Sequence, residues 1–256
     1  AKQVEAIVLD QPQGSFTFTR VKGDAAPADL PSIDELMAKV IEAYGGEANL
    51  RKFKTRVTTL TINFDNQGVT ATGITWAKAP GMSASEFTMT AAGKVIAKGY
   101  NFFDGTGGEE AYTFAPTEKL TGKRLENARI DADFYAPLNW KTLYEKASVL
   151  RKTKCGEEEC YVVEFDSEKG TKTTDFYSTK TNLLVRRDSI IPSSTSSQQI
   201  AITTTFEDYR SVDGIMMPFR SVQNSPSNGR VVTQIREVKH DAKVSDKVFK
   251  SRKLKF

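Results

Sequence analysis

The stretch Thr205–Val222, TFEDYRSVDGIMMPFRSV, places a turn between two strand-like runs. The central SVDG is typical of a hairpin turn, because Gly214 tolerates the backbone angles that such turns need. Apolar side chains alternate along the second run, and those expected on one face are Ile215, Met217 and Phe219. Pro218 has no backbone N–H to donate, which predicts that its strand lies at a sheet edge or at a bulge.

The same alternation, interrupted by turn residues, continues along the chain from Thr55 to His240. The predicted strands cover residues 55–64, 69–78, 83–91, 95–105, 111–116, 147–153, 161–167, 173–179, 183–190, 198–210, 215–224 and 230–240. Their short connections favour antiparallel neighbours over βαβ units. We therefore predict a mainly β, α+β fold: one curved antiparallel sheet of about ten or more strands. Sheets this wide curl, split or close.

Two segments with helical patterns are expected to cover the concave face of this sheet. Residues 32–44 begin with a capping box, Ser32 and Glu35, continue with apolar residues at helical spacing and end at two glycines. A shorter helix is expected over 47–53. The insert 118–146 is mainly helical in pattern, with an interruption near Pro137.

Length and composition suit one large β domain with an appendage. The chain has 256 residues, of which 39% are hydrophobic, and a net charge of +4. Residues 1–30 are expected to form a hairpin and a linker, and 31–256 the main domain. No apolar run is long enough for a transmembrane helix, and no leader pattern follows Ala1, so we expect a removed signal peptide or a longer parent chain. The basic end FKSRKLKF is interpreted as a solvated tail, with only weak support for membrane-surface or nucleic-acid binding.

The two cysteines, Cys155 and Cys160, bracket GEEE between two strand-like runs. A hairpin with this loop would bring the two Cβ atoms opposite each other, near disulfide distance. A metal site needs more ligands, and the only histidine, His240, is far away in sequence. We favour a structural disulfide over two free thiols, and with it an oxidising compartment, periplasmic or extracellular.

Catalytic chemistry has little support in the residue pattern. His240 lies among charges at a predicted strand end and is expected to be exposed. The carboxylate clusters Asp131/Asp133 and Glu157–Glu159 are interpreted as solvated loops rather than a glycosidase pair. The glycine-rich DGTGGEE of residues 104–110 lacks the lysine and the helix of a phosphate loop and predicts a hairpin turn. No catalytic residue, metal site or cofactor is predicted.

Apolar and aromatic side chains at alternate strand positions, together with helix positions, are the strongest candidate site. The candidates for the lining of an apolar cavity are Met37, Ile41, Ile74, Trp76, Phe87, Met89, Tyr112, Phe114, Leu138, Trp140, Ile202, Phe206, Ile215, Met217 and Phe219. One interpretation is a plain core between sheet and helices. The other is that part of this surface lines a cavity for a long apolar ligand, for which adaptable methionines are suited.

Five stretches, in this order along Ser32–Lys250, resemble the LolA/LolB-like family of outer-membrane lipoprotein carriers and sorting proteins. They are AYGG at 43–46, WAKAPGM at 76–82, FFDGTGGEEAYTFAP at 102–116, DFYSTKTNLLVRRDS at 175–189 and DYRSVDGIMMPFRSV at 208–222. Two positions depart from the family pattern. Ser83 and Ser85 occupy the segment where the carriers place an arginine, and Tyr112 stands near the family's usual tryptophan.

The resemblance implies an open half-barrel with helices over its concave side, a cavity for acyl chains, and neither enzyme activity nor a cofactor. The leading hypothesis is a periplasmic carrier or receptor for a lipid or an acylated lipoprotein. It is expected to be a monomer, at most peripheral to the membrane, and not to bind nucleic acid. The alternatives are a non-catalytic interaction domain of a larger envelope protein with a packed core, and an enzyme for a small hydrophobic substrate on the same scaffold.

Overall fold

The computed structural model describes residues 6–11, 14–19, 29–192 and 199–254. The chain divides into two compact units, Ala1–Leu30 and Pro31–Phe256. In the first unit, β1 (Ala6–Gln11) and β2 (Gly14–Thr19) pair antiparallel, so the hairpin expected at the start of the sequence is present. The central residues of its predicted turn, Pro12 and Gln13, lie outside the described residues.

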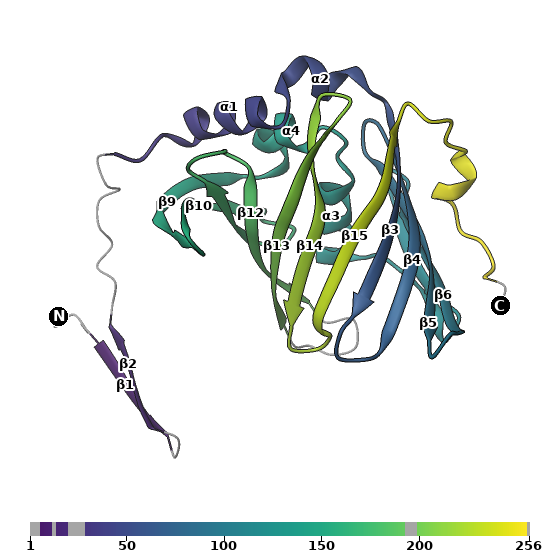
Figure 1. Ribbon diagram of the computed structural model, residues 1–256, viewed down its shortest axis with the longest axis horizontal. Coiled ribbons are helices and arrows are strands. Elements are labelled where there is room, and N and C mark those ends of the chain that lie inside the picture. Colours follow the sequence, from purple (N-terminus) through teal and green to yellow (C-terminus); the bar gives the residue numbers. More distant parts are fainter. Residues whose placement is uncertain (1–5, 12–13, 20–28, 193–198, 255–256) are drawn as a thin grey trace. The chain divides into compact units, whose positions relative to one another are not determined.

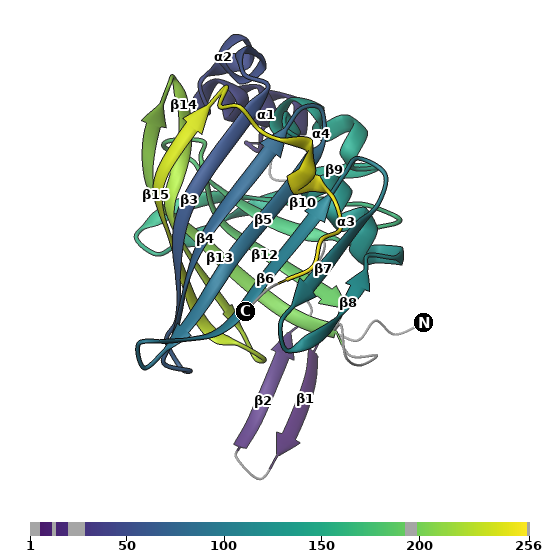
Figure 2. The same ribbon diagram turned by 90° about the vertical axis from the view of Figure 1, so that its right-hand side faces the viewer.

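The second unit is built on one antiparallel sheet, with thirteen strands in the described residues. The strand order is β8-β7-β6-β5-β4-β3-β15-β14-β13-β12-β11-β10-β9. Two meanders, β3–β8 and β9–β15, are thus joined where β15 pairs with β3, and the sheet ends at β8 and β9 without closing (Figures 1 and 2). This confirms the predicted single open antiparallel sheet. The strands are β3 (Thr55–Phe64), β4 (Val69–Lys78), β5 (Met82–Ala91), β6 (Lys94–Phe103), β7 (Gly108–Tyr112), β8 (Ala115–Lys119), β9 (Lys146–Cys155), β10 (Glu158–Asp166), β11 (Thr173–Ser178), β12 (Leu184–Pro192), β13 (Gln199–Val212), β14 (Ile215–Ser225) and β15 (Gly229–His240).

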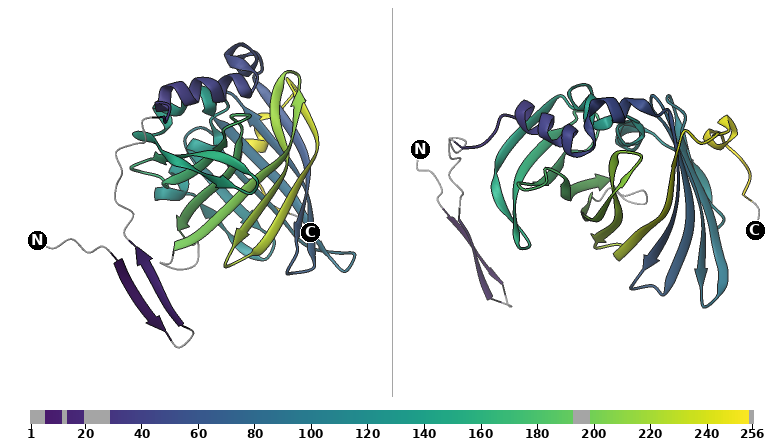
Figure 3. Two further views of the ribbon diagram at one scale, coloured as in Figure 1. Left: turned by 60° about the vertical axis from the view of Figure 1, so that its left-hand side comes forward. Right: turned by 45° about the horizontal axis from the view of Figure 1, so that its top comes forward.

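Helices cover one face of this sheet, which we call the concave face (Figure 3). The helices are α1 (Ile33–Ala43), α2 (Gly46–Lys52), α3 (Gly122–Ala132) and α4 (Ala136–Leu143). The predicted break in the helical insert falls at residues 133–135, and Pro137 stands in the first turn of α4, where its missing N–H costs no helical hydrogen bond. Among the described residues, none of the helices combines the length and the apolar character that crossing a membrane requires.

Helix α1 begins at the predicted capping box. The Ser32 hydroxyl accepts from the Glu35 backbone N–H at 3.2 Å, and the Glu35 carboxylate accepts from the Ser32 N–H at 2.8 Å. The apolar stripe of the helix is buried against strands β10, β11 and β12 and against α4. This core contains Leu36, Met37, Val40, Val163, Phe165, Tyr177 and Leu184, with Trp140, Tyr144 and Phe206 packed around it.

The β13–β14 hairpin is held at its tip by the junction of α1 and α2. Val212 pairs with Ile215 across a two-residue turn, and both turn residues, Asp213 and Gly214, have positive φ, as the Asp-Gly hairpin turn requires. The Met216 N–H donates to the carbonyl of Tyr44 at 3.0 Å. A Cβ on Gly45 would lie 2.1 Å from the Gly214 carbonyl oxygen, so glycine is needed at this close approach.

Pro218 stands in a part of β14 that has only one paired neighbour. The ladder between β14 and β15 runs from Ser225–Gly229 to Arg220–Gln234 and no further, whereas β13 pairs with β14 on either side of Pro218. Figure 1 shows β14 and β15 separating above this point. The missing N–H of Pro218 therefore interrupts no ladder with β15, which agrees with the local edge that the sequence predicts.

The opposite, convex face of β4–β7 carries the C-terminal segment (Figure 2). The short 3₁₀ helix η1 (Asp246–Phe249) buries Phe249 against Ala84, Tyr100 and Phe102. The Arg252 guanidinium lies 4.1 Å from the centre of the Tyr100 ring and pairs with Glu86 at 2.6 Å. The basic end that the sequence suggested to be a solvated tail is therefore, as far as Leu254, packed onto the sheet.

Cys155 and Cys160 form the predicted disulfide, but not across the predicted loop. Cys155 pairs with Glu158 around the turn at Gly156, and Cys160 pairs with Thr153. The strands thus run closer to the turn than expected, and the two cysteines are diagonal rather than direct neighbours, with Cα atoms 6.0 Å apart.

Candidate ligand cavity on the concave face

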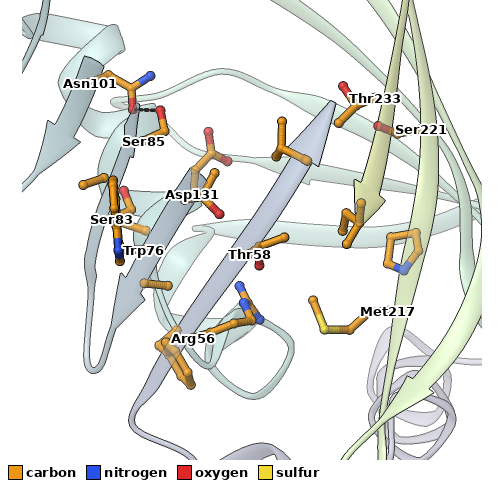
Figure 4. A pocket seen from close by; sticks show the side chains of 18 of the residues that line it. Arg56, Thr58, Trp76, Ser83, Ser85, Asn101, Asp131, Met217, Ser221 and Thr233 are labelled. Atoms are coloured by element: carbon orange, nitrogen blue, oxygen red, sulfur yellow. Dashed lines mark hydrogen bonds between the residues drawn. The ribbon is translucent and has the colours of Figure 1, made fainter. Parts of the chain in front are cut away.

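A cavity of about 430 Å³ lies on the concave face between the strands β3–β6, the strands β13–β15 and the end of α3. We call it the concave-face cavity (Figure 4). Its lining residues are Arg56, Thr58, Leu60, Thr75, Trp76, Ala77, Ser83, Ala84, Ser85, Asn101, Asp131, Ala132, Asp133, Phe134, Phe206, Met217, Pro218, Phe219, Ser221, Thr233 and Ile235.

Strand register explains why many of these side chains meet. Thr58 pairs with Thr75, Thr75 pairs with Ser85, and Ser85 pairs with Asn101, so the four residues form one row across β3–β6. Directly paired residues project from the same face of a sheet. The row is polar throughout, and the Ser85 hydroxyl donates to the Asn101 side-chain oxygen at 2.9 Å.

The lining has a polar side and an apolar side. The row above, with Ser83, makes the polar side. The apolar side comes from the other strands and from the loop after α3, and consists of Leu60, Phe134, Phe206, Met217, Phe219 and Ile235. The cavity therefore suits an amphipathic ligand better than the wholly apolar lining expected from the sequence. The polar side was missed because threonine and serine at alternate strand positions resemble a solvated face.

Arg56 is the cationic residue of the lining. It lies on β3, and Figure 4 shows its side chain extending into the cavity. Burial lowers the pKa of the guanidinium, and no carboxylate counteracts this effect. Its Cζ lies 5.4 Å from the centre of the Phe134 ring, a cation–π distance.

Two carboxylates, Asp131 and Asp133, border the cavity at the end of α3. Burial raises the pKa of Asp131, while Arg187 acts in the opposite direction. Asp131 keeps exposed surface, but that surface faces the interior of the half-barrel rather than bulk solvent. Asp133 accepts from the Tyr135 N–H at 2.8 Å and from the Asn139 side chain at 3.0 Å. The expectation of a loop is wrong for Asp131, which is exposed but lies on α3.

A buried ion pair lies on the β11–β12 part of the concave face. The Arg187 guanidinium donates to both oxygens of Asp175 at 2.7 Å, and Asp175 is fully buried. Burial by itself would lower the pKa of Arg187, but the charge and hydrogen bonds of Asp175 outweigh it and raise the pKa.

Tyrosines surround this ion pair. Burial raises the pKa of Tyr44, Tyr177 and Tyr209, and raises that of Tyr144 to about 12. The hydroxyls of Tyr44 and Tyr209 are 3.3 Å apart, and Tyr209 donates to the Leu184 carbonyl at 2.7 Å. All four phenols therefore stay protonated at neutral pH, and those of Tyr44, Tyr177 and Tyr209 form hydrogen bonds.

Four of the fifteen predicted lining residues border the cavity: Trp76, Phe206, Met217 and Phe219. Pro218 borders it as well, so strict alternation does not describe IMMPF here. Five others belong to the packing of the helices. Met37 and Trp140 lie in the α1 core, and Ile41, Leu138 and Ile215 lie in the core around Leu50 and Phe53.

The β4–β5 register places Ile74 and Phe87 on opposite faces of the sheet, so they do not both belong to the concave face. Ile74 pairs with Glu86, whereas Phe87 pairs with Gly73. Ile74 lies on the convex face, beside Leu254. Trp76 shares the face of Ile74 by register and packs against the cluster around Phe249, although it also borders the cavity. Alternation along each strand predicts which of its residues share a face, but not the register of one strand against the other.

Aromatic residues of β5–β7 form a separate row. The rings of Phe87 and Tyr112 are 5.7 Å apart, and those of Tyr112 and Phe114 are 5.2 Å apart. The Phe87 ring covers Gly99, where a Cβ would lie 2.3 Å from it. Met89 and Ile202 are half-buried on β5 and β13 and do not border the cavity.

His240 is buried, contrary to the expected exposed position. Its side chain is 1% exposed, its ring stacks on Phe53 at 4.4 Å, and its Nδ1 lies 3.0 Å from a carboxylate oxygen of Asp213. Strand β15 brings it next to β3 and beneath the β13–β14 turn, an arrangement that local charge patterning does not reveal. No group of three or more His, Cys, Asp or Glu side chains within the described ranges could hold a metal ion.

Several solved structures share this fold. A DUF1329 family protein from Desulfovibrio piger matches with a TM-score of 0.57 and 14% identity, over 85% of this chain and 97% of that one. A LolA superfamily protein from Nitrosomonas europaea has a TM-score of 0.55 and 14% identity, over 87% and 99%. A domain named for outer membrane lipoprotein sorting, from Vibrio parahaemolyticus, has a TM-score of 0.54 and 9% identity, over 84% and 96%.

These likenesses establish a LolA-like fold, as the sequence resemblance implied. No curated protein matches the chain. Residues 118–256 match a family model with the description "Uncharacterized protein". Because this match spans more than half of the 256 residues, the chain belongs to that family and has the LolA-like fold.

Proposed function

We propose that the protein is a periplasmic carrier or receptor that holds the acyl chain of a lipid or lipoprotein in the concave-face cavity, without catalysing a reaction. The observation that carries the proposal is the cavity itself. Its volume of about 430 Å³ falls in the usual range of ligand pockets, about 300–1,000 Å³, and an unclosed sheet with a LolA-like fold contains it. The Cys155–Cys160 disulfide supports an oxidising compartment.

The apolar side and the polar side of the cavity would bind different parts of the ligand. An acyl chain would lie against Leu60, Phe206 and Ile235, and each buried CH₂ group contributes roughly 0.8 kcal/mol before the cost of ordering the ligand. The polar end of the ligand would meet the row of hydroxyl and amide groups that runs from Thr58 to Asn101. An ester or amide linkage next to an acyl chain can hydrogen-bond there.

A lipid-capture experiment tests this proposal. Protein purified without detergent is incubated with phospholipid vesicles, separated from them and weighed by native mass spectrometry. Thr233→Trp fills the cavity, because Thr233 lines it on β15. Thr72→Trp is the matched control, because Thr72 is exposed on the convex face of β4.

The expected result is one bound lipid on the unchanged protein and on Thr72→Trp, and at least tenfold less on Thr233→Trp. The melting temperatures of both variants show that the fold is kept. The proposal is wrong if the unchanged protein captures no lipid, or if the two tryptophan variants capture equal amounts.

A second candidate is a non-catalytic interaction domain of a larger cell-envelope protein. The observation that favours it is the separate compact unit Ala1–Leu30. Under this alternative, lipid capture fails for all three proteins in the experiment above.

A further inference from the structure

The segment Arg51–Arg56, with the sequence RKFKTR, carries four cations in six residues and ends inside the concave-face cavity. Arg51 pairs with Glu47 at 2.6 Å. Lys54 donates to the phenol oxygen of Tyr135 at 2.9 Å, and Lys52 lies 5.0 Å from the centre of the Phe53 ring. In the described part of the chain, the side chains of Lys52, Lys54 and Arg56 form no ion pair. The Asp241 carboxylate accepts from the backbone N–H of Lys54 at 2.9 Å.

Arg56 is the inner member of this series. By contrast, the exposed Arg210 pairs with Asp208 at 2.7 Å. Arg56 lies among protein atoms and has the Phe134 ring in place of an acid. Two carboxylates border the same cavity, and neither forms an ion pair with Arg56. Arg187 lowers the pKa of Asp131, and Asp133 accepts hydrogen bonds from Tyr135 and Asn139. The cavity thus has a positive end that its own residues leave uncompensated.

An uncompensated buried guanidinium is costly, because desolvation is not repaid by an opposite charge. Its planar array of N–H donors matches the oxygens of a phosphate or a carboxylate. Thr58 is the next residue of β3 on the same face, and Thr75 lies opposite it, so hydroxyl donors stand beside the guanidinium.

We propose that Arg56 binds the negatively charged group of an amphipathic ligand whose acyl chain occupies the apolar side of the cavity. This inference rests on the proposed function and narrows the ligand to an anionic amphiphile. Lys52 and Lys54 precede Arg56 in the sequence and are exposed. Their positive charges attract an anionic ligand toward the cavity by long-range electrostatics.

Titration calorimetry with chain-matched probes tests the proposal. The probes are dodecyl phosphate below its micelle concentration, dodecanol and inorganic phosphate. The proteins are the unchanged chain, Arg56→Gln, Arg56→Lys and the control Arg151→Gln, which makes the same charge change at an exposed position of β9.

The unchanged protein is expected to bind dodecyl phosphate at least tenfold more tightly than dodecanol. Arg56→Gln loses this preference, Arg56→Lys keeps part of it, and Arg151→Gln keeps all of it. The melting temperature of Arg56→Gln stays equal or rises, because an uncompensated charge has been removed.

Four outcomes overturn the proposal. If dodecanol binds but the phosphate adds nothing, or if Arg56→Gln keeps the preference, the charge inference fails while the proposed function stands. If inorganic phosphate binds as tightly as dodecyl phosphate, the site takes a free anion. If no probe binds, the proposed function fails with it.

Discussion

Removing Asp175 leaves the partly buried Arg187 guanidinium without its carboxylate partner, and we expect this to lower the free energy of unfolding. Asp175 is fully buried, and the Arg187 side chain is one-third exposed. Breaking a buried ion pair costs about 3–5 kcal/mol. Because part of Arg187 still reaches solvent, we expect Asp175→Leu to lower the free energy of unfolding by the lower end of this range, about 3 kcal/mol.

The double variant Asp175→Leu/Arg187→Met removes both charges. Comparing its free energy of unfolding with that of Asp175→Leu gives the cost of leaving Arg187 without its carboxylate. Apolar replacement of both partners is often nearly neutral, so the double variant should recover about 2 kcal/mol of the loss. The control Glu47→Gln breaks the exposed pair with Arg51 and should cost about 0.5 kcal/mol or less.

Equilibrium unfolding in urea, with the disulfide intact, measures these differences if all variants share one m-value. The reasoning is refuted if Asp175→Leu costs less than about 1 kcal/mol, or if the double variant is no more stable than the single one. Either result would mean that water reaches Arg187 well enough to replace the carboxylate.

Three further predictions concern the hairpin tip, the cavity and the disulfide. Ile215→Ala should cost about 2–5 kcal/mol in urea unfolding, because Ile215 is 7% exposed among Leu50 and Phe53, and a loss below about 1 kcal/mol would contradict this packing. Burial raises the pKa of Asp131, so its charge destabilises the folded state increasingly as pH rises above the unfolded value near 3.8. Asp131→Asn should therefore melt higher than the unchanged protein at pH 7 and equally at pH 3, and equal melting at both would contradict the inference. The double serine variant of Cys155 and Cys160 should lose about 2 kcal/mol, as the short loop between them implies, and unchanged stability would show that the bridge does not constrain the unfolded chain.

Local patterns in the sequence were sufficient to predict most of the helices and strands of the fold. Alternation and turn residues predicted most of the strands, and the Ser32 capping box and the Asp213–Gly214 turn have the predicted geometry. These features depend on residues close together in the chain, so they can be predicted from the sequence alone. The single antiparallel sheet followed from the number of strands and their short connections, and its open form was implied by the family resemblance.

The site could not be predicted to the same depth, because it depends on register between strands. Shifting β5 by one residue against β4 would exchange the faces of Ser85 and Glu86, and alternation alone does not fix that choice. The cavity therefore contains polar residues such as Thr75 and Ser85 that looked solvated. Ile74, which looked like lining, lies beneath the C-terminal segment instead.

Photo-cross-linking with a phospholipid that carries a diazirine in its acyl chain tests most directly whether the cavity holds such a chain. The labelled protein is digested, and the cross-linked peptides are identified by mass spectrometry. We predict cross-links on the apolar side of the cavity, at Leu60, Phe206 or Ile235. Cross-links confined to the convex face, at Ile74 or Leu254, would contradict lipid binding inside the half-barrel.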